Sequence, residues 1–305
     1  MKNTLKIATR KSPLALWQAE FVKLQLQGLH PNLEVELIKM TTKGDQILNS
    51  PLSKIGGKGL FIKELEIGML EGRADIAVHS MKDVPYALPE EFELGAIMAR
   101  ENPFDAFVSN NYSHLTDLPI GARVGSCSMR RVVQIKALRP DLEILDLRGN
   151  VNTRLKKLDD GEYDAIILAC AGLIRLGFED RIRHSLDVET SLPAVGQGAL
   201  GIEIRKGDSE VAKLIQGLID QETMTAVLAE RAMNATLEGG CSVPIAAYAT
   251  LDEKSLTLKG LVGNVSSAKI LTETCTGSTA EPEALGKLVA NNLIAKGAKK
   301  LLNME

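Results

Sequence analysis

The sequence lacks the features of a secreted or membrane protein. Residues 1–7 contain no apolar stretch of a signal peptide, and no apolar run is long enough to span a bilayer. We therefore expect a cytoplasmic protein with no membrane partner, or an organellar protein whose transit peptide has been removed.

Metal and disulfide patterns are missing as well. The four cysteines (Cys127, Cys170, Cys241 and Cys275) form no CxxC pair, and the four histidines show no HExxH-like spacing. These absences argue against a zinc site, so no metal is expected. Thiols spaced this widely are predicted to be reduced and unpaired.

Strong charge, internal repeats and low-complexity tracts are also absent. The net charge of −3 argues against non-specific binding to nucleic acid, although it leaves room for a local basic pocket. What is present is an ordinary globular composition of 305 residues, with 45% hydrophobic and 25% charged. A chain of this length is expected to form two or three domains of about 100–150 residues each.

Alternating strand and helix patterns predict an α/β fold. Strands are predicted at 4–9, 34–40, 75–79, 92–99 and 104–109, with helices after Ser12-Pro13 and at 60–70. The pattern then restarts, with strands at 123–125, 143–147 and 165–169 and helices at 128–138 and 151–158. This spacing favours two units, each with a parallel sheet and covering helices.

The strand predicted at 199–204 is expected to return the chain to the first unit, which would give two crossings and a hinge. A long helix from 221 to 237, strands at 245–250, 256–262 and 269–275, and a helix at 282–295 form an α+β unit. The predicted domains are therefore residues 1–99 with 199–217, residues 100–198, and residues 218–305.

Arginines cluster where strands lead into helices. Arg130 and Arg131 stand in the first turn of a predicted helix, after Ser126 and Ser128, either of which can cap it. Positive charge there opposes the helix dipole, which makes more sense if an anion binds. The alternative is two surface arginines that reach into solvent.

Further arginines share this setting. Arg148 and Arg154 flank the predicted cap Asn150, and Arg10 ends the first strand. Because ligand crevices of open α/β sheets lie at the carboxyl ends of strands, these arginines favour an anion-binding cleft. No GxxxxGK[ST] loop is present, so carboxylates are a better match than phosphates.

Two other segments carry reactive side chains. Lys82 and Asp83 follow a strand end, where a carboxylate beside cations stays ionised and can stabilise a cation or relay a proton; the alternative is a surface ion pair. Cys241 follows two glycines in a predicted turn, and Cys127 is the rival thiol in a loop. No histidine stands in a cysteine-protease motif, so Cys241 is better suited to attachment than to hydrolysis.

Taken together, these segments resemble the porphobilinogen deaminase family, also called hydroxymethylbilane synthase. The match runs in order along almost the whole chain, through IATRKSPLA at 7–15, GKGLF at 57–61, HSMKD at 79–83, SMRR at 128–131, RGNV at 148–151, LPAVGQG at 192–198 and GGC at 239–241.

The resemblance implies two α/β domains like those of periplasmic binding proteins, with a cleft between them, and a smaller α+β domain that carries the cysteine. It implies a transferase of tetrapyrrole biosynthesis that joins four porphobilinogen molecules head to tail, releases ammonia each time and frees hydroxymethylbilane with water. The implied cofactor is dipyrromethane, held by a thioether at Cys241. A monomer is expected.

The resemblance also assigns roles to residues. Asp83 matches the catalytic aspartate, and Cys241 matches the covalent cofactor site. Contacts to the cofactor are implied for Ser80, Lys82, Ser128, Arg130 and Arg131. Contacts to the carboxylates of the substrate are implied for Arg10, Arg148, Arg154 and Arg175. Positions in a lid or in the cleft are implied for Lys58, Phe61 and Gln197. Cys127 departs from the family, where serine is expected.

One alternative function belongs to another class. A binding or sensor module for an organic polyanion would use the same arginines and hinged α/β units, but it has no use for Cys241 or Asp83.

Overall fold

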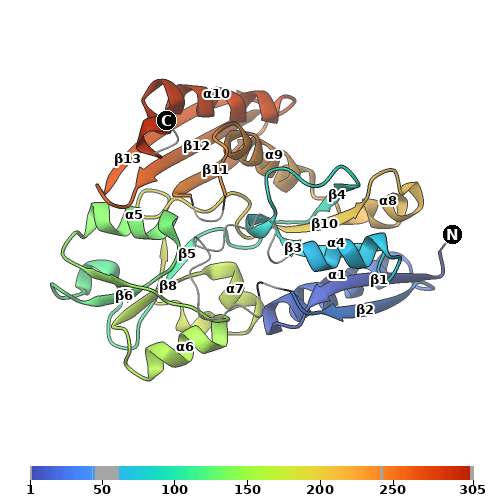
Figure 1. The fold of residues 1–305 in the computed structure, drawn as a ribbon, viewed down its shortest axis with the longest axis horizontal. Coiled ribbons are helices and arrows are strands. Elements are labelled where there is room, and N and C mark those ends of the chain that lie inside the picture. Colours follow the sequence, from blue (N-terminus) through green and yellow to red (C-terminus); the bar gives the residue numbers. More distant parts are fainter. Residues whose placement is uncertain (1, 43, 45–61, 241–242, 303–305) are drawn as a thin grey trace. The chain divides into compact units, whose positions relative to one another are not determined.

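The computed structural model describes residues 2–42, 44, 62–240 and 243–302 (Figure 1). The chain forms two compact units, one of Met1–Arg100 with Ala199–Met224 and the other of Glu101–Gly198 with Thr225–Glu305. Within the described residues no helix is long and apolar enough to cross a membrane.

The first unit contains a five-stranded sheet with the order β2-β1-β3-β10-β4. Its strands are β1 (Thr4–Arg10), β2 (Glu34–Met40), β3 (Ile76–Ser80), β4 (Phe92–Ile97) and β10 (Leu200–Arg205). β1 pairs in parallel with β2 and β3. β10 lies between β3 and β4, so the chain does return to the first sheet as expected.

The sequence predicted a parallel sheet, and β10 departs from that prediction because it runs antiparallel to both neighbours. The cause is the point of entry. The Ala199 carbonyl oxygen accepts from the Met81 amide, directly after β3 ends. A strand that begins where β3 ends has to run in the opposite direction.

Helices cover both faces of this sheet. Helix α1 (Pro13–Leu29) begins as predicted, with the Ser12 hydroxyl accepting from the Ala15 amide and Pro13 in the first turn. It packs on one face together with α8 (Ser209–Ile215) and the 3₁₀ turn η4 (Gln216–Leu218). Helix α4 (Lys63–Leu70) packs on the opposite face through Leu65 and Met69.

The second sheet has the order β7-β6-β8-β5-β9. Its strands are β5 (Asp105–Val108), β6 (Arg123–Gly125), β7 (Glu143–Leu145), β8 (Ala165–Ala169) and β9 (His184–Leu186). β6 is parallel to β7 and β8, whereas β5 is antiparallel to β8 and β9. This sheet is therefore mixed in the same way as the first.

One face of this second sheet packs against α5 (Met129–Leu138), and the other packs against α6 (Val151–Asp159) and α7 (Cys170–Arg175). Short 3₁₀ turns η2 (Leu115–Asp117) and η3 (Glu179–Arg181) lie in its connections. β8 has the predicted bounds of 165–169, and Cys170 begins α7 directly after it.

A third, antiparallel sheet follows helix α9 (Gln221–Thr236), as the α+β prediction required (Figure 1). Its strands are β11 (Ile245–Asp252), β12 (Ser255–Asn264) and β13 (Lys269–Ser278). Helices α10 (Pro282–Ala295) and α11 (Ala298–Leu301) pack on it and enclose an apolar core with α9. The fold class is confirmed. The three domain boundaries, the hinge and the cleft stay predictions.

Candidate active site

One candidate pocket lies in the first unit, where β1 and β3 end beside the start of α1. Arg10, Ser80 and Asp83 all line it, together with His79 and Gln18, around a cavity of about 60 Å³. Three residues that the sequence singled out separately therefore meet at the carboxyl edge of one sheet, as the strand-end rule predicts.

Short-range contacts hold this edge in place. The Ser80 hydroxyl accepts from Gln18 Nε2 of α1 at 2.8 Å. The next three residues form the 3₁₀ turn η1 (Met81–Asp83), which is tied to the start of β10 by the Met81 amide. Met81 is buried, Lys82 is half-buried and Asp83 is exposed. The turn thus presents the Asp83 carboxylate to the pocket from a fixed base.

The second unit holds a buried ionic cluster around Asp105, the first residue of β5. Asp105 is 0% exposed and accepts six hydrogen bonds. The donors are Arg130 Nη1 (2.7 Å) and Nη2 (3.1 Å), Arg131 Nε (2.9 Å) and Nη2 (2.7 Å), Ser191 Oγ (2.7 Å) and Gln197 Nε2 (3.0 Å).

Charge is unbalanced in this cluster. Burial alone would raise the pKa of Asp105, but the guanidinium groups of Arg130 and Arg131 lower it far below its usual range. The carboxylate is therefore ionised, and two buried cations share one buried anion. Burial also lowers the pKa of Arg130, and the charge of Asp105 counteracts this. Such a cluster favours a second anion.

Asp105 also changes the interpretation of the arginines at the start of α5. An anion was expected to meet them, and the structure supplies one from within the chain. Ser128 occupies the N-cap position, but its side chain makes no capping bond. Ser126 instead accepts from the Ser128 amide at 3.3 Å. Neither arginine reaches into solvent, because Arg130 is 5% and Arg131 6% exposed.

A glycine-dependent turn carries Arg148 and Arg154. Gly149 has φ of 111°, and a Cβ at this position would collide with Thr153. The prediction that Asn150 caps α6 is confirmed, since its side chain accepts from the Thr153 amide at 2.9 Å. Arg154 Nε donates to the Gly149 carbonyl at 2.8 Å, which braces the turn from the helix side.

The turn Gly196–Gly198 joins several candidates. Gln197 Nε2 donates to Pro103 and Asp105, and Arg175 Nη2 donates to the Gly198 carbonyl at 2.6 Å. Burial lowers the pKa of Arg175 to about 10, and Glu101 opposes that shift. Arg175 and Gln197 therefore belong to the same buried region as Arg130 and Arg131.

Several sequence-based assignments lie outside the described residues. These are the attachment site Cys241 and the lid residues Lys58 and Phe61. Cys127, Cys170 and Cys275, which are described, are all free thiols.

Sequence reasoning missed Asp105, Ser191 and Glu230. Glu230 of α9 is 0% exposed and accepts from the amides of Gly196 and Ala249. The spacing of these residues gave no signal. An isolated acid that opens a strand, or that stands in a helix, differs from a surface acid only in what surrounds it after folding.

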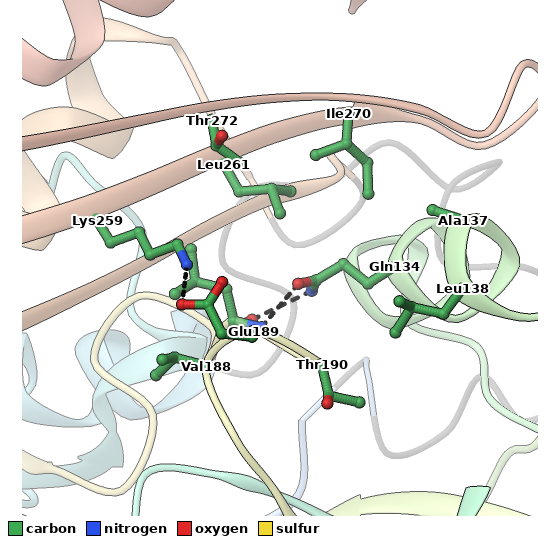
Figure 2. A pocket seen from close by; sticks show the side chains of 11 residues that line it. Gln134, Ala137, Leu138, Val188, Glu189, Thr190, Lys259, Leu261, Ile270 and Thr272 are labelled. Atoms are coloured by element: carbon green, nitrogen blue, oxygen red, sulfur yellow. Dashed lines mark hydrogen bonds and ion pairs between the residues drawn. The ribbon is translucent and has the colours of Figure 1, made fainter. Parts of the chain in front are cut away.

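A larger cavity, of about 180 Å³, lies between α5 and strands β12 and β13. Its wall is mainly apolar, and its one ion pair joins Lys259 Nζ to Glu189 Oε1 at 2.6 Å (Figure 2). Gln134 turns its amide to Leu192 rather than into the space. The groups that suit a polycarboxylate therefore lie elsewhere.

A sheet-edge pocket lined by Arg10 and Asp83 and a buried cluster of arginines favour an α/β enzyme that acts on an anionic substrate. Comparison with known proteins gives its family. Residues 5–213 match the model for the "Porphobilinogen deaminase, dipyromethane cofactor binding domain" and residues 224–295 match its C-terminal domain. The chain belongs to the porphobilinogen deaminase family.

Two curated relatives named porphobilinogen deaminase support this assignment over the full length. The chain is 65% identical over 302 residues to the protein of Vesicomyosocius okutanii and 66% identical over 302 residues to that of Ruthia magnifica, with 99% of each chain covered in both cases. Enzymes of this family are transferases of tetrapyrrole biosynthesis.

Two solved structures that share features of the fold are only distantly similar to this chain. The methionine-binding protein MetQ matches with a TM-score of 0.46 and 14% identity over 77% of this chain and 94% of that one. A periplasmic substrate-binding protein from Coxiella burnetii matches with a TM-score of 0.45 and 13% identity over 74% and 96%. These likenesses say nothing about ligand or activity.

Proposed function

We propose that this chain joins four porphobilinogen molecules head to tail on a dipyrromethane cofactor attached to Cys241, releases ammonia at each addition and frees hydroxymethylbilane with water. Full-length membership of the family supports the reaction. The observation that carries the proposal at the level of residues is the buried cluster of Arg130 and Arg131 on Asp105.

The residues of the second unit fit a group that bears several carboxylates. Arg130 and Arg131 keep a surplus positive charge beside Asp105, and Arg175 stands in the same buried region. Arginine presents its N–H groups as a planar fork that pairs with a carboxylate through two hydrogen bonds. Arg130 and Arg131, with Ser128, would hold the acetate and propionate groups of the cofactor. When bound, the cofactor supplies the pyrrole carbon to which the first substrate is joined.

Arg10, Arg148, Arg154 and Arg175 are assigned to the carboxylates of incoming substrate. Arg10 lines the first pocket, and Arg148 and Arg154 stand on the braced turn before α6. Porphobilinogen carries an acetate and a propionate, so each unit added brings two more anions. A set of separate arginines suits a chain whose carboxylates accumulate.

Asp83 is assigned the catalytic step. Loss of ammonia leaves a positively charged pyrrole, and a carboxylate placed beside it stabilises that charge and can accept or return a proton. Ser80 ends β3 and Lys82 directly precedes Asp83 in η1, where they can contact cofactor or substrate. Lys58, Phe61 and Gln197 are assigned to a lid or to the cleft. Monomeric state, cytoplasmic location and the absence of a nucleic-acid partner stay predictions.

Intact-mass spectrometry tests the proposal directly. The purified protein is expected to exceed the mass of its sequence by that of a covalent dipyrrole, or to gain this adduct when the apoprotein is given porphobilinogen. A protein that shows no adduct and acquires none would favour the alternative, a polyanion-binding module without chemistry.

Replacing Cys241 with serine is expected to give folded protein without the adduct, because a serine oxygen forms no thioether. Intact mass and circular dichroism measure the two properties separately. Cys127→Ser, which changes the rival thiol, serves as the matched control and should keep the adduct. An adduct retained in C241S at another residue would contradict the assignment of Cys241.

A further inference from the structure

Three acid–base groups form a continuous chain behind the first pocket. Glu203 of β10 and His79 of β3 face the same side of the sheet, since Gly201 is paired with His79 and Glu203 with Ala77. His79 Nε2 lies 2.8 Å from Glu203 Oε2, and both side chains are buried, at 6% and 0% exposed. His79 also lines the pocket that holds Asp83.

The second carboxylate oxygen of Glu203 needs a hydrogen-bond donor, because it is buried. Glu203 Oε1 is buried, and no donor among the described residues reaches it. Besides His79, the side chain of Glu66, from α4 on the same face of the sheet, reaches Glu203. Two ionised carboxylates repel each other, whereas a carboxyl and a carboxylate share a strong hydrogen bond.

The electrostatic surroundings agree with this geometry. Burial and the charge of Glu203 raise the pKa of Glu66 to about 7, with Glu91 adding to the rise and His79 opposing it. The other charged group on this side of β10 is Arg205, which is occupied by the Met69 and Ala74 carbonyls and by Asp75 and Asp208. Glu66 therefore lies beside the buried side chain of Glu203. Among the groups that act on Glu66, the imidazole of His79 is the one that opposes the rise in the pKa of Glu66.

We propose that Glu66, Glu203 and His79 form a proton-holding chain, in which a proton shared by the two glutamates orients the imidazole of His79 at the wall of the pocket with Asp83. In this arrangement Glu203 accepts from Glu66 on one side and from His79 Nε2 on the other. These residues act by positioning and need not touch the substrate. The link to turnover rests on the proposed function, whereas the shared proton does not.

The chain has a definite pH signature. Because folding raises the pKa of Glu66 from 4.5 to about 7, the folded state holds a proton that the unfolded state loses. The contribution of this proton to the free energy of unfolding is fully present below pH 4.5 and falls between pH 4.5 and about 7. Above about pH 7 the contribution of Glu66 no longer changes with pH. Above pH 7 the shared proton leaves for solvent, and repulsion between the two carboxylates displaces Glu203, the group that orients His79.

The test is Glu66→Gln, which keeps a hydrogen-bond donor to Glu203 Oε1 at every pH and removes the titration. Urea unfolding of wild type and E66Q between about pH 5 and about pH 8 should show that wild type loses stability relative to E66Q, by roughly tenfold in the folding equilibrium. The control Glu20→Gln removes an exposed charge on the opposite helix α1 and should run parallel to wild type. Equal pH dependence in wild type and E66Q would overturn the shared proton.

A second variant guards against misinterpretation. Glu203→Gln removes the buried anion that Glu66 faces, so it should abolish the same pH dependence, and E66Q added to E203Q should change it no further. If E203Q keeps the wild-type dependence, Glu203 is not the partner and the chain is refuted.

Turnover tests the link to the pocket. With porphobilinogen, kcat of wild type should fall relative to E66Q as the pH rises above 7, by about tenfold once Glu66 is fully ionised, while KM changes little. Parallel kcat profiles, despite pH-dependent unfolding, would overturn the positioning role of His79. If the protein carries no adduct and consumes no porphobilinogen, the proposed function fails, and unfolding still decides on the chain.

Discussion

Replacing Asp83 with asparagine should lower turnover by about a hundredfold or more, while the fold and the cofactor adduct remain. Asparagine has nearly the same shape as aspartate, so the substitution removes the negative charge and the proton acceptor and little else. Asp83 is exposed at the end of η1, whose base is held by buried Met81, and the change therefore leaves packing intact.

Release of ammonia from porphobilinogen measures the effect, and intact mass measures the adduct in the same sample. Glu90→Gln is the matched control, since it neutralises an exposed carboxylate in the segment that follows η1 and should leave turnover unchanged. Near-normal turnover in D83N would remove Asp83 from the mechanism.

Replacing Asp105 with asparagine should destabilise the protein by about 3–5 kcal/mol, the usual cost of leaving a buried charge without its partner. Both Arg130 and Arg131 would then lack the carboxylate that accepts four of their hydrogen bonds. The amide that replaces it carries no charge and also presents N–H groups to two cations. Urea unfolding of the apoprotein measures the loss.

The same substitution should slow the uptake of cofactor from porphobilinogen, because the two arginines would no longer be held in one orientation. Asp160→Asn is the control. It breaks an exposed pair with Lys156 at 2.7 Å on the surface of α6 and should change stability by less than about 0.5 kcal/mol. A D105N protein as stable as D160N would show that the buried arginines do not depend on this carboxylate.

Elements with strong local signals were predicted well from the sequence. The strand Glu34–Met40 and the helix Pro282–Ala295 have the predicted bounds, and Ser12 and Asn150 cap the helices as expected. In each case the signal is local, being an apolar period or a capping residue that acts within a few positions.

Features that depend on distant partners were not predicted. The direction of β10 follows from where the chain re-enters the sheet, and no residue of β10 encodes it. Helix α7 spans only Cys170–Arg175, too short for a helical period to stand out.

The residues of the candidate site also fall into those with a local sequence signal and those without one. Its strand-end residues, such as Arg10 and Asp83, were found because parallel strands bring their ends together. Asp105 and the pair of Glu66 and Glu203 were not found, because the role of a buried acid depends on which groups fold against it.

The position of β10 also constrains how the protein can be made. β10 is the only bridge between β3 and β4 among the described strands, and it is translated about a hundred residues after β4. Until then the nascent chain carries two open sheet edges, at β3 and at β4, of the kind that pair with other chains. Translation interrupted within residues 101–198 should therefore yield an aggregation-prone fragment rather than a folded first unit, and chaperone demand should peak over that interval.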